Sequence, residues 1–112
     1  MAATTETPLV TLEDRDVRAL TECMSVLSDV GMVAGAEGLY TVVSESGRSY
    51  TVDIETGSCD CDDAFYRDPD GGCKHVRRVR FATGRRAIPE WVNEDAVDEQ
   101  LGLHCSVEVL ID

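Results

Sequence analysis

The stretch from Cys59 to His75 constrains the fold of this chain more than any other feature. It contains two close pairs, Cys59 with Cys61 and Cys73 with His75, separated by eleven residues. The 112-residue chain has few other residues of these types, namely Cys23, His104 and Cys105. Structural zinc takes four thiolate or imidazole ligands in a tetrahedron. The stretch therefore predicts one Zn²⁺ per chain, with ligands Cys59, Cys61, Cys73 and His75.

The spacing within each pair predicts how the ligands are presented. Zinc–sulfur bonds of about 2.3 Å place two ligand sulfurs ~3.8 Å apart. Side chains two residues apart in an extended segment point the same way, which suits Cys59 and Cys61. Residues two apart on a helix do not share a face. Cys73 is therefore predicted at a helix cap, with His75 in the first turn, where unpaired N–H groups favour a thiolate.

Four protein ligands would close the site and leave no position for water, so we expect a structural role and no enzyme activity. No small-molecule substrate is expected. A Cys59–Cys61 disulfide would close a very small, strained ring. A cysteine nucleophile with His75 as its base would lack an orienting group and an oxyanion site. A Cys3His set suits zinc, although the sequence alone leaves iron open.

The composition is strongly acidic, with 22 acidic and 10 basic residues and a formal charge of −12. Lys74 is the one lysine, which resembles the proteome bias of extreme halophiles; the alternative is an acidic mesophilic protein. Such a surface keeps a protein soluble but repels itself unless salt screens it. We expect a soluble, cytoplasmic protein with no membrane contact, because no apolar run approaches the length of a bilayer span and the start lacks a secretion signal.

The pattern along the chain predicts an α+β fold in a single domain, residues 12–112, after a flexible tail, residues 1–11. Apolar residues at three- and four-residue steps predict a helix from about Leu12 to Asp29, capped by Thr11. Two β-branched segments around a Gly-containing loop predict a β-hairpin. The other expected elements are a zinc-bound ββα-like unit, a short helix from Lys74 to Thr83, a brief helix from Asn93 to Leu101 and a final strand from Leu103 to Ile111. The hairpin strands are expected at Leu39–Ser44 and Ser49–Ile54.

Several single residues have expected positions. Phe65 and Tyr66 are expected to tuck under the metal site, since they are the large apolar residues between the two ligand pairs. Trp91 is expected in the core. Cys23 and Cys105 fall on apolar faces, and His104 is expected at the surface.

The pattern Cys59-Asp60-Cys61, eleven residues, Cys73-Lys74-His75 resembles that of the SWIM-type zinc finger family, which is CxC, a variable spacer and CxH. The resemblance covers about residues 39–84 and includes the strand before the motif and the helix after it. It implies a zinc-bound ββα unit with the ligands Cys59, Cys61, Cys73 and His75. It also implies DNA binding or protein–protein interaction, in contexts such as transposases, chromatin remodellers and recombination accessory proteins. The further residues that carry the likeness are Tyr50, Val52, Gly57, Phe65, Val76 and Val79.

Six of the ten basic residues lie within thirteen positions after the last cysteine, with no acidic residue between Gly71 and Pro89. With Val76 and Val79 facing inward, Arg77 and Arg78 would point away and meet DNA or RNA phosphates. The alternatives are internal pairing of these arginines with carboxylates, or a protein–protein adaptor. The candidate nucleic-acid-binding residues are Lys74, Arg77, Arg78, Arg80, Arg85 and Arg86.

Overall fold

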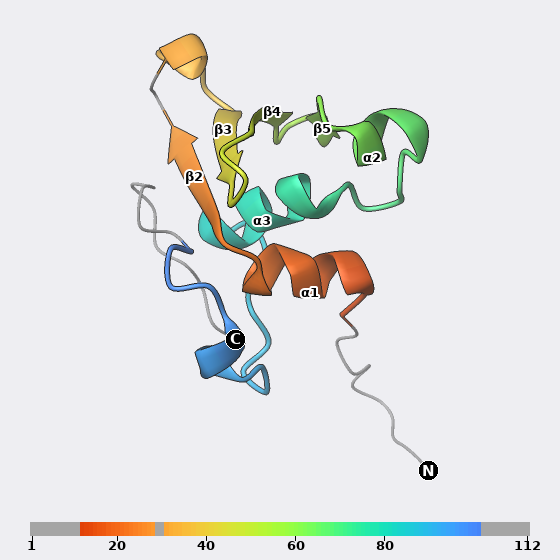
Figure 1. Ribbon diagram of the computed structural model, residues 1–112, viewed down its shortest axis with the longest axis vertical. Coiled ribbons are helices and arrows are strands. Elements are labelled where there is room, and N and C mark those ends of the chain that lie inside the picture. Colours follow the sequence, from red (N-terminus) through yellow and green to blue (C-terminus); the bar gives the residue numbers. More distant parts are fainter. Residues whose placement is uncertain (1–11, 29–30, 102–112) are drawn as a thin grey trace.

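The fold is α+β: a helix, a four-stranded antiparallel sheet and further helices. A computed structural model describes residues 12–28 and 31–101 (Figure 1). In chain order the helices and strands are α1 (Asp14–Thr21), β2 (Met24–Ser28), β3 (Leu39–Ser44), β4 (Ser49–Asp53), β5 (Ser58–Cys59), α2 (Asp62–Tyr66) and α3 (Lys74–Ala82). Two 3-10 turns complete it, η1 (Gly31–Val33) and η2 (Glu94–Ala96).

The sheet has the order β2-β3-β4-β5, with each neighbouring pair antiparallel. The predicted hairpin is confirmed as β3 and β4, in which Val42 lies opposite Tyr50 and Tyr40 opposite Val52. Val42 and Val52 are fully buried on one face of the sheet. The alternation of apolar and polar residues thus sets which face of the hairpin meets the core.

Helix α3 is the central element, and it lies between the sheet and α1 (Figure 1). On one side Val76, Val79 and Ala82 pack against buried side chains of β2, β3 and β4. On the other side Phe81 packs with Ala19 and Leu20 of α1. Because neighbours cover both sides, seven of its nine residues are buried.

The prediction of one long helix from Leu12 to Asp29 is wrong in its second half. Helix α1 ends at Thr21, Glu22 is extended, and β2 follows from Met24. In β2, Met24 and Val26 are buried and alternate with less buried neighbours, which is the two-residue period of a strand. Because β2 pairs with β3 over its full length, the segment forms a strand rather than the second half of a helix. The helix cap is also corrected: Glu13 and Asp16 form the capping box.

After α3 the expectations hold in part. Trp91 is 59% exposed, so its expected place in the core is wrong. Asn93 caps a helix as expected, accepting a hydrogen bond from the Asp95 N–H, but that helix is the single turn η2. The expected strand from Leu103 to Ile111, with His104 and Cys105, lies outside the described residues. Among the described residues, no helix has the length and apolar character to cross a bilayer.

Candidate metal centre

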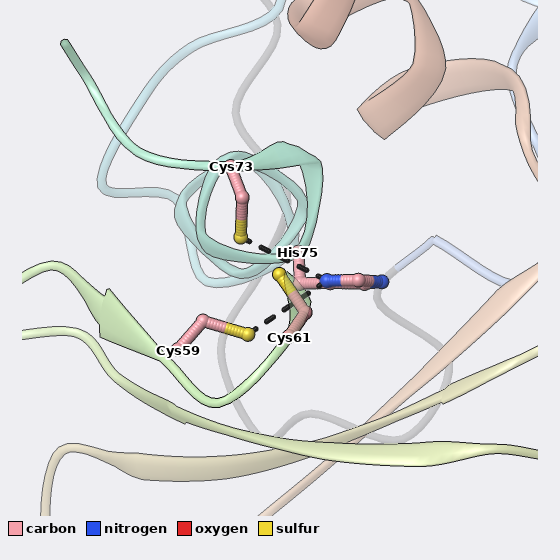
Figure 2. A group of neighbouring side chains, drawn as sticks. All are labelled: Cys59, Cys61, Cys73 and His75. Carbon is pink, nitrogen blue, oxygen red and sulfur yellow. Dashed lines mark hydrogen bonds between the residues drawn. The ribbon is translucent and has the colours of Figure 1, made fainter. Parts of the chain in front are cut away.

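The structure brings the four predicted ligands together at one end of α3. One donor atom from each of Cys59, Cys61, Cys73 and His75 lies within 4.8 Å of all the others. Figure 2 shows the three sulfur atoms and the imidazole ring turned toward a common point. The ring nitrogen that faces the sulfurs is Nδ1, which lies 3.7 Å from the Sγ atoms of both Cys59 and Cys73.

The first pair is presented by the end of the sheet and the start of a short helix. Cys59 ends β5, opposite Val52 of β4. Cys61 is the N-cap of α2, and its sulfur accepts a hydrogen bond from the Ala64 N–H at 3.4 Å. Between them, an Asp60 carboxylate oxygen accepts a hydrogen bond from the Thr51 N–H at 2.9 Å. That bond holds the turning residue, so both sulfurs face the same way.

The second pair is presented by the N-terminus of α3, as the spacing predicts. Cys73 is the N-cap and His75 lies in the first turn. Gly72 has φ of +91°, and a Cβ there would lie 2.9 Å from Val76. Only glycine fits without a shift, and this tight approach sets the direction in which the chain enters the helix.

The four donor atoms could hold a metal ion, and the donor set and two of their distances are compatible with zinc. Bond lengths of about 2.3 Å to sulfur and 2.1 Å to nitrogen in a tetrahedron imply sulfur–nitrogen distances of about 3.6 Å. The two sulfur–nitrogen distances of 3.7 Å agree with this. The ring of Tyr50 stacks on that of His75, with centroids 4.3 Å apart and planes inclined by 24°, which limits rotation of the ligand ring.

The pKa values of the three thiols are pushed in opposite directions. Hydrogen bonding with Cys59 lowers the pKa of Cys73 to about 4. Hydrogen bonding with Cys73, together with burial, raises the pKa of Cys59. Burial raises the pKa of Cys61. Burial and the charge of a neighbouring thiolate both oppose ionisation of all three thiols, and a bound cation would offset these two effects.

The residues expected beside the site lie elsewhere. Phe65 and Tyr66 are 77% and 76% exposed, so the expectation that they tuck under the metal is wrong. The segment between the ligand pairs forms α2, which points these rings outward with an edge-to-face contact of 4.8 Å between centroids. The cysteines instead pack with Val52, Val76 and other apolar residues of the main core, and the aromatic ring beside the site is that of Tyr50, stacked on His75.

Arg77 and Arg78 do not point away from the protein as expected. Their exposed fractions are 3% and 0%, because α1 covers the side of α3 on which they lie. Arg77 donates to Asp16 and Glu13 at 3.1 and 2.6 Å. Arg78 pairs with Asp98 and donates to backbone carbonyls of α1 and β2. For these two arginines, internal pairing replaces the expected contact with phosphate.

The other four basic residues of that group stay at least partly exposed. Lys74 donates to Glu22 at 2.6 Å, and Arg86 pairs with the buried Asp16. Arg80 donates to the Gly71 carbonyl oxygen at 2.6 Å. Arg85 is exposed, and its guanidinium lies 5.8 Å from the centre of the Tyr40 ring. Cys23 is partly exposed, lies outside the metal cluster and accepts a hydrogen bond from Gln100.

Sequence reasoning missed the basic residues that surround the metal centre in space. Arg15 and Arg18 come from α1, Arg48 from the β3–β4 loop and Arg67 from the end of α2. They are scattered along the chain, so only the tertiary fold gathers them. The sequence does contain a local signal for α2, which contributes Arg67. Asp62 and Asp63, directly after Cys61, are typical of the first turn of a helix.

Comparisons with protein-family models, with curated proteins and with solved structures found no match to this chain.

Proposed function

We propose that this protein is a SWIM-type zinc module in which one Zn²⁺ is held by Cys59, Cys61, Cys73 and His75. The convergence of the four donor atoms within 4.8 Å carries the proposal. The order CxC then CxH, with a hairpin before and a helix after, supports the SWIM type. Bound zinc would supply a tetrahedral cross-link between β5, α2 and α3. Because four protein ligands fill that shell, the role is structural rather than catalytic.

Metal content tests this directly. Protein purified without added metal is expected to hold one zinc per chain by elemental analysis. Cys61→Ser should lower that content, whereas Cys23→Ser, outside the cluster, should leave it unchanged. A wild-type protein free of zinc, or one that contains iron instead, would overturn the zinc assignment.

The module is proposed to bind a macromolecule, and the surface supports a protein partner better than DNA. Phe65 and Tyr66 are exposed on α2, directly after the ligand Cys61. Large exposed aromatic side chains are enriched where proteins contact one another. Two of the six arginine and lysine residues expected to meet phosphates are buried instead. This makes the protein an interaction adaptor, with recombination or transcription proteins as candidate partners.

An affinity pull-down from nuclease-treated extract tests the adaptor. The wild type should retain a partner that Phe65→Ser with Tyr66→Ser loses, at unchanged zinc content. Trp91→Ser is the matched control, since Trp91 is also an exposed aromatic residue but lies far along the chain from α2. Equal retention by the double variant and the control would contradict a docking role for α2.

DNA binding remains the second candidate, through the exposed cations near α3. Arg80 and Arg85 are the residues to test, because neither pairs with a carboxylate among the described residues. Arg77→Glu with Arg78→Glu is unsuitable, since both side chains are buried and their loss would disturb the fold. Arg80→Glu with Arg85→Glu should weaken binding to a duplex probe and flatten its salt dependence. Unchanged affinity of a folded variant would eliminate this candidate.

A further inference from the structure

A cleft of about 440 Å³ lies beside the metal centre. Its walls come from α1, the β3–β4 hairpin and the α2 segment, and the ligands Cys61 and His75 line it. Cavities that hold small ligands are typically about 300–1,000 Å³. The cleft is therefore large enough for a small anion or a nucleotide.

The charge of the cleft differs from that of the protein as a whole. Five of the ten basic residues of the chain line it, against three of the 22 acidic residues. In a chain with a formal charge of −12, this collects positive charge at one place. The five basic residues are Arg15, Arg18, Arg48, Arg67 and Lys74.

Three of these cations are already paired. Arg15 donates two hydrogen bonds of 2.8 Å to the two carboxylate oxygens of Asp63. Arg67 shares the same carboxylate at 3.4 Å, and Lys74 pairs with Glu22 at 2.6 Å. Asp63 thus already pairs with two of the cations that line the cleft.

Arg18 and Arg48 have no side-chain partner among residues 12–28 and 31–101. They come from different walls, since Arg18 lies in α1 and Arg48 in the β3–β4 loop. The carboxylates of Asp60 and Asp62, which also line the cleft, make no ion pair with either of them. Two guanidinium groups on separate walls, neither with a side-chain partner in the described part of the chain, suit a multivalent anion that can accept from both.

Part of the cleft lining is rigid. His75 is 4% exposed and stacked on Tyr50, which also lines the cleft. A preorganised wall lowers the entropic cost of binding an anion.

We propose that this cleft binds a phosphate group, carried by a free nucleotide or by the end of a nucleic-acid strand. A phosphate monoester carries up to about two negative charges and three acceptor oxygens, enough for both free guanidinium groups. A single carboxylate carries half that charge, and the cleft already supplies one to Arg15. The cleft shares α2 with the surface proposed for partner binding, but Phe65 and Tyr66 do not line it. It rests on the zinc proposal only for the position of His75.

Isothermal titration calorimetry of zinc-loaded protein tests the cleft, with inorganic pyrophosphate as the first probe. The wild type is expected to bind, with an affinity that falls as salt rises. Arg18→Gln with Arg48→Gln should weaken binding by about tenfold or more, since both charge-assisted contacts are lost. Arg85→Gln is the matched control, because Arg85 is exposed but lies outside this cleft, and it should bind like the wild type.

Two further probes distinguish the sources of the phosphate. Adenosine 5′-monophosphate is compared with adenosine, and a 5′-phosphorylated oligothymidylate with its 5′-hydroxyl form. No binding of any phosphate by folded protein, or equal binding by the double variant and the wild type, would overturn the proposal. Tighter binding of polyglutamate than of every phosphate probe would also overturn it. Zinc content measured in each sample separates this result from the metal proposal, because a zinc-free protein would contradict only the latter.

Discussion

Helix α3 is fixed to its neighbours by two polar clusters of different kinds. At its N-terminus, four donor atoms that could hold a metal ion bring it together with β5 and α2. On its side, Arg77 pairs with the buried Asp16 of α1, while Arg78 pairs with Asp98 and donates to backbone carbonyls of α1 and β2. The first cluster lies within seventeen consecutive residues, whereas the second joins residues 20 to 61 positions apart.

The two clusters also differ in how they contribute to stability. Metal binding adds directly to the free energy of folding. Burying an ion pair is costly, and attraction between the charges does little more than offset that cost. Removing one partner of a buried pair is nevertheless strongly destabilising, because the other charge stays buried without compensation. A metal ion bound at the first cluster would therefore supply stability, while the arginine cluster mainly fixes which surfaces meet.

The largest expected effect follows from removing a metal ligand. Cys73→Ser should unfold the protein at room temperature, since structural zinc contributes roughly 10 kcal/mol or more in small zinc modules. Circular dichroism with and without a chelator would measure this, and wild-type protein stripped of zinc should behave like the variant. A Cys73→Ser protein that melts like the wild type would show that the fold does not depend on the metal.

Next in size is the loss of the buried carboxylate of the other cluster. Asp16→Asn removes the buried charge that pairs with Arg77 and leaves the exposed carboxylate of Glu13 as its ion-pair partner among the described residues. This should lower the free energy of unfolding by about 3–5 kcal/mol. Asp14→Asn, an exposed acid in the same helical turn, is the control and should cost less than about 1 kcal/mol. Urea denaturation of zinc-loaded protein measures both. If the two variants lost similar amounts of unfolding free energy, the burial of Asp16 would contribute nothing to stability.

A smaller loss is expected from Arg78→Lys. Lysine keeps the charge but cannot reach the carbonyl oxygens of Ala19, Glu22 and Met24 together. The acceptors left unpaired should cost about 1–3 kcal/mol. The same denaturation series detects this, and Arg85→Lys at the exposed surface should change nothing. Full stability of Arg78→Lys would argue that water replaces the lost bonds.

The smallest expected effect on stability comes from the ion pair between Arg15 and Asp63, which is sensitive to acid. The hydrogen bonds from Arg15 lower the pKa of Asp63 from 3.8 to about 2. A depressed pKa contributes stability above pH 3.8, and that contribution is lost as the pH falls toward 2. Because the pair is partly exposed, Asp63→Asn should cost less than about 1 kcal/mol at pH 6. The difference from the wild type should shrink between pH 4 and about 2, as followed by urea denaturation. A difference that stays constant over this range would exclude ionisation as its source.

The well-predicted part of the fold is the part with local signals. Turn residues and alternation located the hairpin, and ligand spacing placed Cys73 at a helix cap and His75 in the first turn. The expectation for Arg77 and Arg78 failed because it assumed that α3 had one covered side. No local pattern reveals that α1 packs on the other side, since its partner residue Asp16 lies 61 positions away from Arg77.

The other incorrect predictions also concern features that depend on tertiary packing rather than on a local sequence pattern. Met24 and Val26 fit a helical stripe as well as a strand, and only pairing with β3 decided between them. Phe65 and Trp91 were assigned to the interior from side-chain type alone, although large apolar residues also occur at surfaces. The cleft beside the metal centre could not be predicted from the sequence, because Arg18, Arg48 and Arg67 lie far apart along the chain and line one cleft only in the folded structure.

The hydrogen bonds of Arg78 also constrain the order in which the chain folds. Its acceptors at the end of α1 and the start of β2 lie 54 to 59 residues earlier in the sequence. Closing so long a loop has an entropic cost, and such contacts form late unless other contacts have already brought the segments together. During synthesis α1 leaves the ribosome before α3, so the carbonyl groups at the junction of α1 and β2 lack the Arg78 donor until α3 follows. This junction is thus expected to be among the last of the described segments to reach its final structure.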